Sequence, residues 1–425
     1  MTDAAATTSS FPDGFLWGAA TAGHQVEGGN VNADIWPLEW AQPSLFVEPS
    51  GDACDHYHRY PEDIATMAGL GLNAYRFSLE WSRIEPEPGY FSRAALDHYR
   101  RMIGTCLDHG VAPVVTYCHF TTPRWFAGQG GWTGADAVDR FARYAERATA
   151  HLGDLLGWVA TVNEPNVITM LELTGVIPMG TSSDEAPVGD AGGGDDEGGE
   201  ATFGVGGHDP DRYRMGLVGT DVARMAAIHR AAAEAIKAGP GDAKVGWTLA
   251  LVDLQAGDGG EERFTRARQG AQLDWLEVSQ DDDWVGVQTY SRNVLGSDGV
   301  LPVPEGVPTM QTGWEVYPPA LGHTVRLAAE HAGVPVMVTE NGMATDDDAA
   351  RLAYTRGALE GLAGAIADGV DVRGYLHWTL LDNFEWMAGF AKTFGLVAFD
   401  HETFARTVKP TARWLGEVAK ANALV

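Results

Sequence analysis

Short apolar runs alternate along the chain with longer stretches in which apolar residues recur at helical spacing. The runs predict strands over residues 15–23, 74–81, 112–120, 157–164, 244–251, 284–290, 335–340 and 372–382. The periodic stretches predict helices over residues 64–70, 94–109, 136–152, 220–238, 261–278, 319–331, 349–368 and 410–423. Because eight strands alternate with helices, we expect the α/β class and a single (β/α)8 TIM barrel over residues 1–425.

One segment interrupts this alternation after the fourth predicted strand. Residues 181–209 are rich in Gly, Asp and Glu and show no apolar periodicity, which predicts an inserted loop. The acidic spacing matches neither the EF-hand loop nor the glycine-rich nonapeptide repeat, so a solvated loop is favoured over a calcium site. We expect this loop to line or cover the entrance of the site.

Two predicted strands deliver a glutamate to the same end of the barrel. The run V-M-V-T-E-N-G places Glu340 after a buried strand, and W-V-A-T-V-N-E-P places Glu164 in the same position. Barrel enzymes carry their chemistry at the carboxyl ends of the strands. For either glutamate alone an ordinary salt bridge is the simple alternative. A pair suits glycoside hydrolysis, in which one carboxyl must be protonated and the other ionised.

The other strand ends carry neutral hydrogen-bonding groups, further charged groups and indoles. They are Gln25, Arg76, His119, Asn163, Tyr290, Trp378, Glu385 and Trp386. Such a set suits a sugar, because hydroxyls need paired polar partners and the apolar face of a pyranose stacks on an aromatic ring. The sequence contains neither a P-loop motif nor a dinucleotide fingerprint after a strand.

Composition narrows the possible partners and the cellular location. The net charge of −29 argues against nucleic acid or an anionic membrane as a partner. The acidic surface is explained by solubility or, alternatively, by adaptation to salt. Three cysteines give no disulfide framework, and the first ten residues lack the pattern of a signal peptide. No apolar run reaches the length of a membrane span, so a cytoplasmic location is expected.

A series of motifs occurs in order along nearly the whole chain. They are F-P-D-G-F-L-W-G-A-A-T-A-G-H-Q-V-E-G (11–28), C-D-H-Y-H-R-Y-P-E-D (54–63), Y-R-F-S (75–78), W-S-R-I-E-P (81–86), T-V-N-E-P (161–165), T-E-N-G (339–342), L-L-D-N-F-E-W (380–386) and F-G-L (394–396). Together they resemble glycoside hydrolase family 1, the β-glucosidase family.

The resemblance implies a retaining β-glycosidase, with β-glucosidase as the first expectation, that acts through a covalent glycosyl-enzyme intermediate. Glu164 matches the acid/base and Glu340 the nucleophile. The matched supporting groups are Arg76 and Tyr290 beside the nucleophile, Asn163 at the sugar 2-hydroxyl, Trp378 under the sugar, and Gln25, His119, Glu385 and Trp386 at its other hydroxyls. The resemblance implies no metal or cofactor, so His56 and His58 are expected to be structural.

Several positions depart from the family pattern and leave the sugar preference open. Phe120 replaces a usual tryptophan, Gln288-Thr289 replaces Asn-Tyr, and Phe390 and Thr393 replace Tyr and Arg. Glu80 replaces a small residue, and a salt bridge is favoured over substrate contact for it. A 6-phospho-sugar is a minor alternative. The same intermediate would allow transglycosylation, and a sugar-binding protein without catalysis is an alternative that both glutamates argue against.

Overall fold

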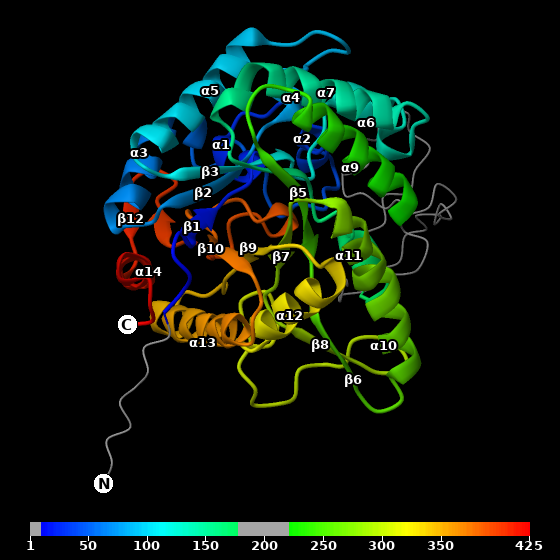
Figure 1. Ribbon diagram of the computed structural model, residues 1–425, viewed down its shortest axis with the longest axis vertical. Coiled ribbons are helices and arrows are strands. Elements are labelled where there is room, and N and C mark those ends of the chain that lie inside the picture. Colours follow the sequence, from blue (N-terminus) through cyan, green and yellow to red (C-terminus); the bar gives the residue numbers. More distant parts are fainter. Residues whose placement is uncertain (1–9, 177–220) are drawn as a thin grey trace.

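Figure 1 shows the computed structural model, which describes residues 10–176 and 221–425. Eight parallel strands close into a barrel in the order β1-β10-β9-β7-β5-β4-β3-β2. They are β1 (Leu16–Ala20), β2 (Ala74–Ser78), β3 (Ala112–Cys118), β4 (Trp158–Asn163), β5 (Lys244–Ala250), β7 (Trp284–Gln288), β9 (Val336–Asn341) and β10 (Val372–Trp378). The predicted (β/α)8 barrel is confirmed, and the predicted insertion at 181–209 lies outside the described residues.

Helices surround the barrel and bury one face against it (Figure 1). They are α3 (His56–Leu70), α5 (Arg93–Asp108), α7 (Ala137–Leu152), α9 (Val222–Lys237), α10 (Glu261–Arg268), α11 (Asp274–Val278), α12 (Ala320–Ala332), α13 (Asp348–Ala367) and α14 (Pro410–Ala421). On α7, for example, Phe141, Tyr144 and Ala148 are buried at helical spacing. Helices cover the outside of the barrel and side chains fill its inside. All residues of β7 and β9 are therefore buried.

Short elements in the connecting segments were not predicted. They are α1 (Gly23–Glu27), α2 (Trp36–Glu39), α4 (Trp81–Ile84), α6 (Arg124–Gly128), α8 (Val167–Thr174), the strand pair β6 (Asp253–Ala256) and β8 (Arg292–Leu295), and the pair β11 (Val397–Phe399) and β12 (Arg406–Val408). Single 3-10 turns span Gly131–Thr133, Gly153–Leu155, Ser279–Asp281 and Trp386–Ala388. Each is too short to display a periodic pattern in the sequence.

Several predicted strand boundaries were wrong, because the predicted strands were too long at their carboxyl ends. The first, second, third and eighth predicted strands run past the observed ends at Ala20, Ser78, Cys118 and Trp378. The chain stays buried beyond each of these residues while its backbone leaves the ladder, so the apolar pattern overstates the strand. The excess residues form the rim at the carboxyl ends of the strands.

The first long helix begins at His56 rather than at residue 64. Its first turns are polar and contain Pro61, which hides the helical pattern. His56 Nδ1 lies 2.8 Å from Asp63 Oδ2, and His58 Nδ1 lies 2.6 Å from Asp55 Oδ1. Both histidines therefore have carboxylate partners within the fold. The predicted helix 261–278 is divided by a π-helical turn at Gln269–Leu273.

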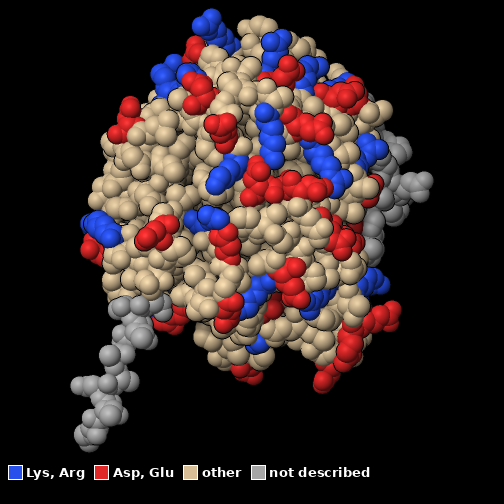
Figure 2. All heavy atoms as spheres, in the orientation of Figure 1, with Lys and Arg blue, Asp and Glu red and all other residues tan. Residues whose placement is uncertain are grey.

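The described surface and helices add three findings on partners and ligands. Lysine and arginine side chains are scattered among acidic ones on the face seen in Figure 2, so the basic groups form no continuous surface there. Over residues 10–176 and 221–425, no helix is long and apolar enough to cross a membrane. The same residues contain no group of three or more His, Cys, Asp or Glu that could hold a metal ion.

Candidate active site

Arg76 crosses the barrel interior and joins side chains from several strands. Its Nη1 donates to Glu340 Oε1 at 2.6 Å, and its Nη2 donates to Asn163 Oδ1. Its Nε donates to Thr116 Oγ1 on the neighbouring strand at 3.1 Å. Since β2 pairs only with β1 and β3, the guanidinium reaches β4 and β9 across the lumen. The ends of β4 and β9, which carry the two predicted glutamates, are thus held together.

Glu340 is the last but one residue of β9 and is 4% exposed. One carboxyl oxygen accepts from Arg76, and the other accepts from the Tyr290 hydroxyl at 2.6 Å. Burial raises the pKa of Glu340 above its ordinary value, while the Arg76 charge and these two hydrogen bonds oppose the rise. The surroundings therefore favour the ionised form as far as a buried site allows.

Glu164 follows β4 in a left-handed backbone conformation, with φ of +44°. Its backbone N–H donates to Thr248 O at 2.8 Å, which fixes the turn. Burial raises the pKa of Glu164 well above its ordinary value, and the negative charge of Glu340 adds to the rise. The two carboxyls therefore differ in their surroundings: Glu340 accepts hydrogen bonds from Arg76 and Tyr290, which oppose the rise in its pKa, whereas the Glu340 charge adds to the rise in the pKa of Glu164.

Asn163 is held in one orientation by a set of donors. Its Oδ1 accepts from Arg76, from Thr248 Oγ1 at 3.0 Å and from Gln288 Nε2 at 2.8 Å. Its Nδ2 therefore points away from these groups and lies 3.2 Å from His119 Nε2. With the carbonyl oxygen occupied, the amide N–H groups are the part of Asn163 that remains for a ligand.

Glu385 and its neighbours form a second polar corner. Gln25 Nε2 donates to Glu385 Oε2 at 3.3 Å and to Phe384 O at 2.8 Å. The Trp378 side chain is also hydrogen-bonded to Glu385. Burial raises the pKa of Glu385 to about 8, with the charge of Glu340 adding to it. This corner thus offers both donors and acceptors to a ligand.

The rings of His119, Trp378 and Trp386 form a wall, in which His119 contacts Asn163 and Trp378 contacts Glu385. His119 is nearly parallel to Trp378, with centroids 5.8 Å apart, and to Trp386, at 6.2 Å. Phe120 meets the Trp386 ring edge-on at 5.4 Å. The structure therefore brings together all ten predicted site residues, and each contacts or faces another of the set.

Unused polar atoms and backbone strain both concentrate here. Among the described residues, Gln25 Oε1, His119 Nδ1 and Gln288 Oε1 are buried without a hydrogen-bond partner. Such atoms are costly unless a ligand or water satisfies them. Phe120 and Trp386 share the left-handed conformation of Glu164, with φ of +67° and +48°. Strain of this kind in non-glycine residues is typical of functional sites.

Thr248 was not predicted as a site residue, and Gln288 was predicted only as a departure from the family pattern. Both fix the Asn163 amide, as described above. The signal for Thr248 was a lone hydroxyl inside the apolar strand V-G-W-T-L-A. Gly342 has a steric role, because a Cβ there would lie 2.0 Å from Trp378 O. The glycine of T-E-N-G therefore allows β9 and β10 to approach beneath the site.

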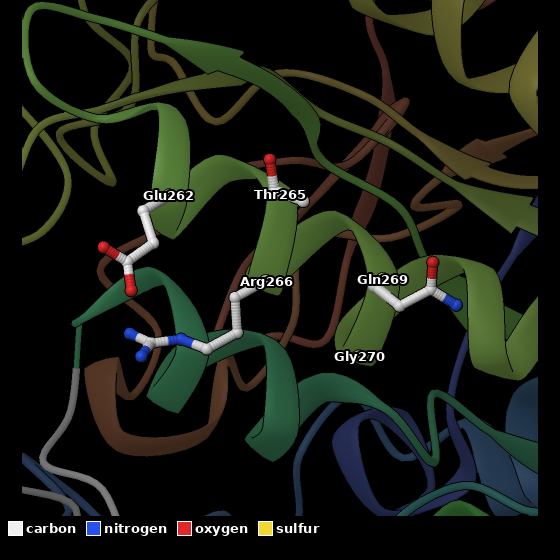
Figure 3. Close-up of a pocket in the computed structure, with 5 residues that line it drawn as sticks. All are labelled: Glu262, Thr265, Arg266, Gln269 and Gly270. Atoms are coloured by element: carbon white, nitrogen blue, oxygen red, sulfur yellow. The ribbon is translucent and has the colours of Figure 1, made fainter.

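A groove elsewhere on the surface has a different character. It is lined by Glu262, Thr265, Arg266, Gln269 and Gly270. Figure 3 shows that all five come from α10 and the π-helical turn after it. The four side chains are exposed, and none belongs to the predicted set. The barrel end, and not this groove, therefore holds the candidate site residues.

Comparison with known proteins gives consistent relatives. A model of glycosyl hydrolase family 1 matches residues 7–190 and 276–424. Thermostable β-glucosidase B of Thermobispora bispora is 33% identical, over 99% of this chain and 93% of its own length. β-Glucosidase A of Thermotoga maritima is 30% identical, over 97% of this chain and 98% of its own length.

Solved structures agree with this result over the whole chain. The β-glycosidase BGL167 is 48% identical with a TM-score of 0.89, covering 98% of each chain. The Thermotoga maritima β-glucosidase in complex with glucoimidazole is 28% identical with a TM-score of 0.82, covering 98% of this chain and 100% of its own.

Proposed function

The chain belongs to glycosyl hydrolase family 1, and we propose on that basis that it is a retaining β-glycosidase that removes a terminal, non-reducing β-D-glucosyl residue. The observation that carries the proposal is the difference between the two carboxyls. Glu340 is held by Arg76 and Tyr290, whereas Glu164 has a pKa well above its ordinary value and no cationic partner within ion-pair distance among the described residues.

The reaction proceeds by double displacement. Glu340 attacks the anomeric carbon while Glu164 gives its proton to the glycosidic oxygen, so the C–O bond to the leaving group breaks as the glycosyl-enzyme ester forms. Glu164 is then ionised, and it takes a proton from water as that water attacks the same carbon. The ester bond breaks, Glu340 leaves as a carboxylate, and the sugar departs with its original configuration.

The surrounding groups fit an uncharged hexose. The Asn163 amide N–H groups would bind the 2-hydroxyl, and Arg76 and Tyr290 would stabilise the Glu340 carboxylate as it leaves the ester. Gln25, His119, Glu385 and Trp386 would bind the other hydroxyls, and Trp378 would stack on the sugar ring. Their unused buried atoms, described above, are matched by hydroxyls that both donate and accept.

Glucose is favoured over a 6-phospho-sugar. Several relatives, including those from Thermobispora and Thermotoga, are named β-glucosidases. Lys392, a cation in the segment after β10, donates to Gln311 O at 2.6 Å. A phosphate would have to displace that bond and would add charge to a site that already holds three carboxyls.

Two properties of the whole molecule are also proposed. We infer that the chain forms one catalytic domain, because both glutamates and Arg76 come from one closed barrel. We place it in the cytoplasm, because Cys54, Cys106 and Cys118 are all unpaired and buried.

The test is hydrolysis of aryl β-glucoside, β-galactoside, β-fucoside, β-mannoside and 6-phospho-β-glucoside, followed by NMR of the sugar first released. We expect the glucoside to be cleaved fastest and the β-anomer to form first. Glu340→Gly serves as the blank and should abolish turnover. Release of the α-anomer first, or turnover that survives in the blank, would overturn the assignment.

A further inference from the structure

Glu80 is the second residue after β2, which ends at Ser78, and it is 1% exposed. Its Oε2 accepts from Asn30 Nδ2 at 2.7 Å and from Thr121 Oγ1 at 2.9 Å. Its other oxygen has no hydrogen-bond partner among the described residues, and a Cβ at Gly23 would lie 2.7 Å from it. The salt bridge favoured from the sequence is not found in the described structure. Two neutral donors hold the carboxyl instead.

The first of these donors leads to the segment after β1. Asn30 Nδ2 also lies 3.1 Å from His24 Nδ1, and His24 Nε2 lies 2.6 Å from Glu39 Oε1. The His24 ring is parallel to Trp386, with an interplanar angle of 7° and centroids 6.0 Å apart. His24 also precedes Gln25, which binds Glu385. The hydrogen bonds from Glu80 through Asn30 to His24 therefore support Gln25 and Trp386, the two proposed sugar-binding residues beside His24.

The second donor leads to the segment after β3. Thr121 N donates to His119 O at 2.8 Å, which closes a tight turn around Phe120. Phe120 has the left-handed conformation noted above, and such strain persists only where the surroundings hold it. The bond from Thr121 to Glu80 is the side-chain anchor of this turn. The turn presents His119 and Phe120 to the Trp386 ring, which His24 also contacts.

We propose that Glu80 is a positioning residue for the sugar subsite, which joins the segments after β1 and β3 so that His24, His119 and Phe120 set the position of Trp386. This proposal rests on the proposed function. A small residue at position 80 would leave the Thr121 hydroxyl and one N–H of the Asn30 amide without their buried acceptor, which is unfavourable. A carboxyl oxygen accepts both donors at once. Glu80 thereby sets how well glucose is distinguished from its C4 epimer, because that distinction depends on where the wall places its polar groups.

The test compares four variants by aryl β-glucoside and β-galactoside kinetics. Glu80→Ala removes the acceptor, and Thr121→Val removes one donor with little change of shape. Glu80→Gln keeps an oxygen that accepts both donors. Burial raises the pKa of Glu80 to about 7, with the charge of Glu27 adding to it, so a neutral side chain is a fair substitute. Asp282→Asn is the matched control.

The control carboxyl is largely buried, with its side chain 7% exposed, and belongs to another hydrogen-bonded group. Asp282 Oδ1 is 2.8 Å from His229 Nε2, whose Nδ1 is 2.6 Å from Thr161 Oγ1. We expect Asp282→Asn to lower the melting temperature and leave the ratio of kcat/KM for glucoside to that for galactoside unchanged. The control therefore shows what loss of a buried polar bond does to stability alone.

For Glu80→Ala we expect kcat/KM on the glucoside to fall about 10- to 100-fold and the glucoside-to-galactoside ratio to fall about tenfold. Glu80→Gln should stay within about threefold of the wild type, and Thr121→Val should fall between the two. A folded Glu80→Ala enzyme with an unchanged ratio would overturn the proposal. Should that variant fail to fold, an unchanged ratio in Thr121→Val would do the same.

Binding gives a readout that does not need turnover. A titration with 1-deoxynojirimycin followed by tryptophan fluorescence measures binding, because Trp378 and Trp386 of the ring wall are among the 14 tryptophans. We expect weaker binding in Glu80→Ala and Thr121→Val than in Asp282→Asn, and equal binding in all three would contradict a positioning role. If the wild type cleaves none of the aryl glycosides, it is the proposed function that fails, and the titration still tests Glu80.

Discussion

Replacing Tyr290 with phenylalanine is the most direct test of how Glu340, the proposed nucleophile, is kept ionised. The Tyr290 hydroxyl donates to Glu340 Oε2 at 2.6 Å, and Arg76 donates to the other oxygen. The variant keeps the ring, which packs beside Trp314 and Phe394, and removes only the donor. It leaves one oxygen of a buried carboxylate without that partner.

The size of the effect follows from the kind of bond removed. A hydrogen bond to a charged group contributes about 1.5–3 kcal/mol, and this bond favours only the ionised form of Glu340. Its loss makes ionisation harder, so the acidic limb of the kcat/KM profile should move to higher pH by about one to two pH units. At a pH below the new limb, kcat/KM should fall about 10- to 100-fold.

The assay is kcat/KM for an aryl β-glucoside across the pH range, for the wild type and Tyr290→Phe. The exposed Tyr90 provides a control, since Tyr90→Phe should leave the profile unchanged. An acidic limb at the same pH in Tyr290→Phe would refute the reasoning. It would mean that Arg76 alone determines the ionisation of Glu340.

Three further predictions concern the fold around the site. Trp247 is fully buried and donates to Ser279 Oγ at 2.7 Å, so Trp247→Ala should lower the free energy of unfolding by about 3–5 kcal/mol in a denaturant titration. Burial raises the pKa of Asp34 to about 7, so its contribution to stability is full below the unfolded value near 3.8 and is lost as pH rises through 7. Between pH 4 and pH 8 the melting temperature of Asp34→Asn should therefore fall less than that of the wild type. An equal fall in both proteins would count against the raised pKa of Asp34. Gly342→Ala should lower both melting temperature and kcat, because its Cβ would meet Trp378 O at 2.0 Å; an unchanged kcat would show that β9 and β10 can separate without disturbing the site.

The strands and their polar ends were predictable from sequence because a strand that is buried on both faces has an uninterrupted run of apolar residues. The run before Glu340 is the clearest example: Val336, Met337 and Val338 are each fully buried. Where the run ends, a polar side chain faces either solvent or a functional site. In a (β/α)8 barrel the functional site lies at the carboxyl ends of the strands, so polar residues there are site candidates. The positions of Glu164 and Glu340 follow from that rule together with the family motifs.

Other features depended on contacts between distant segments, which no local pattern records. The partners of Glu80 come from two segments, at Asn30 and at Thr121, and nothing in the local sequence around Glu80 indicates either. The start of α3 was missed because its first turns are polar. Thr248 was missed because a threonine within a strand is unremarkable until its hydroxyl is seen to face Asn163.

Because Arg76 reaches across the barrel, enzymatic turnover depends on closure of the barrel during folding. Glu164 and Arg76 lie in the half of the chain that forms β1 to β4, and Glu340 lies in the half that forms β5 to β10. Neither half contains Glu164, Arg76 and Glu340 together, and the guanidinium can meet Glu340 only when β1 has paired with β10 and β4 with β5. The rate at which turnover recovers during refolding therefore reports when these strands pair, an event that helix content measured by circular dichroism would not register.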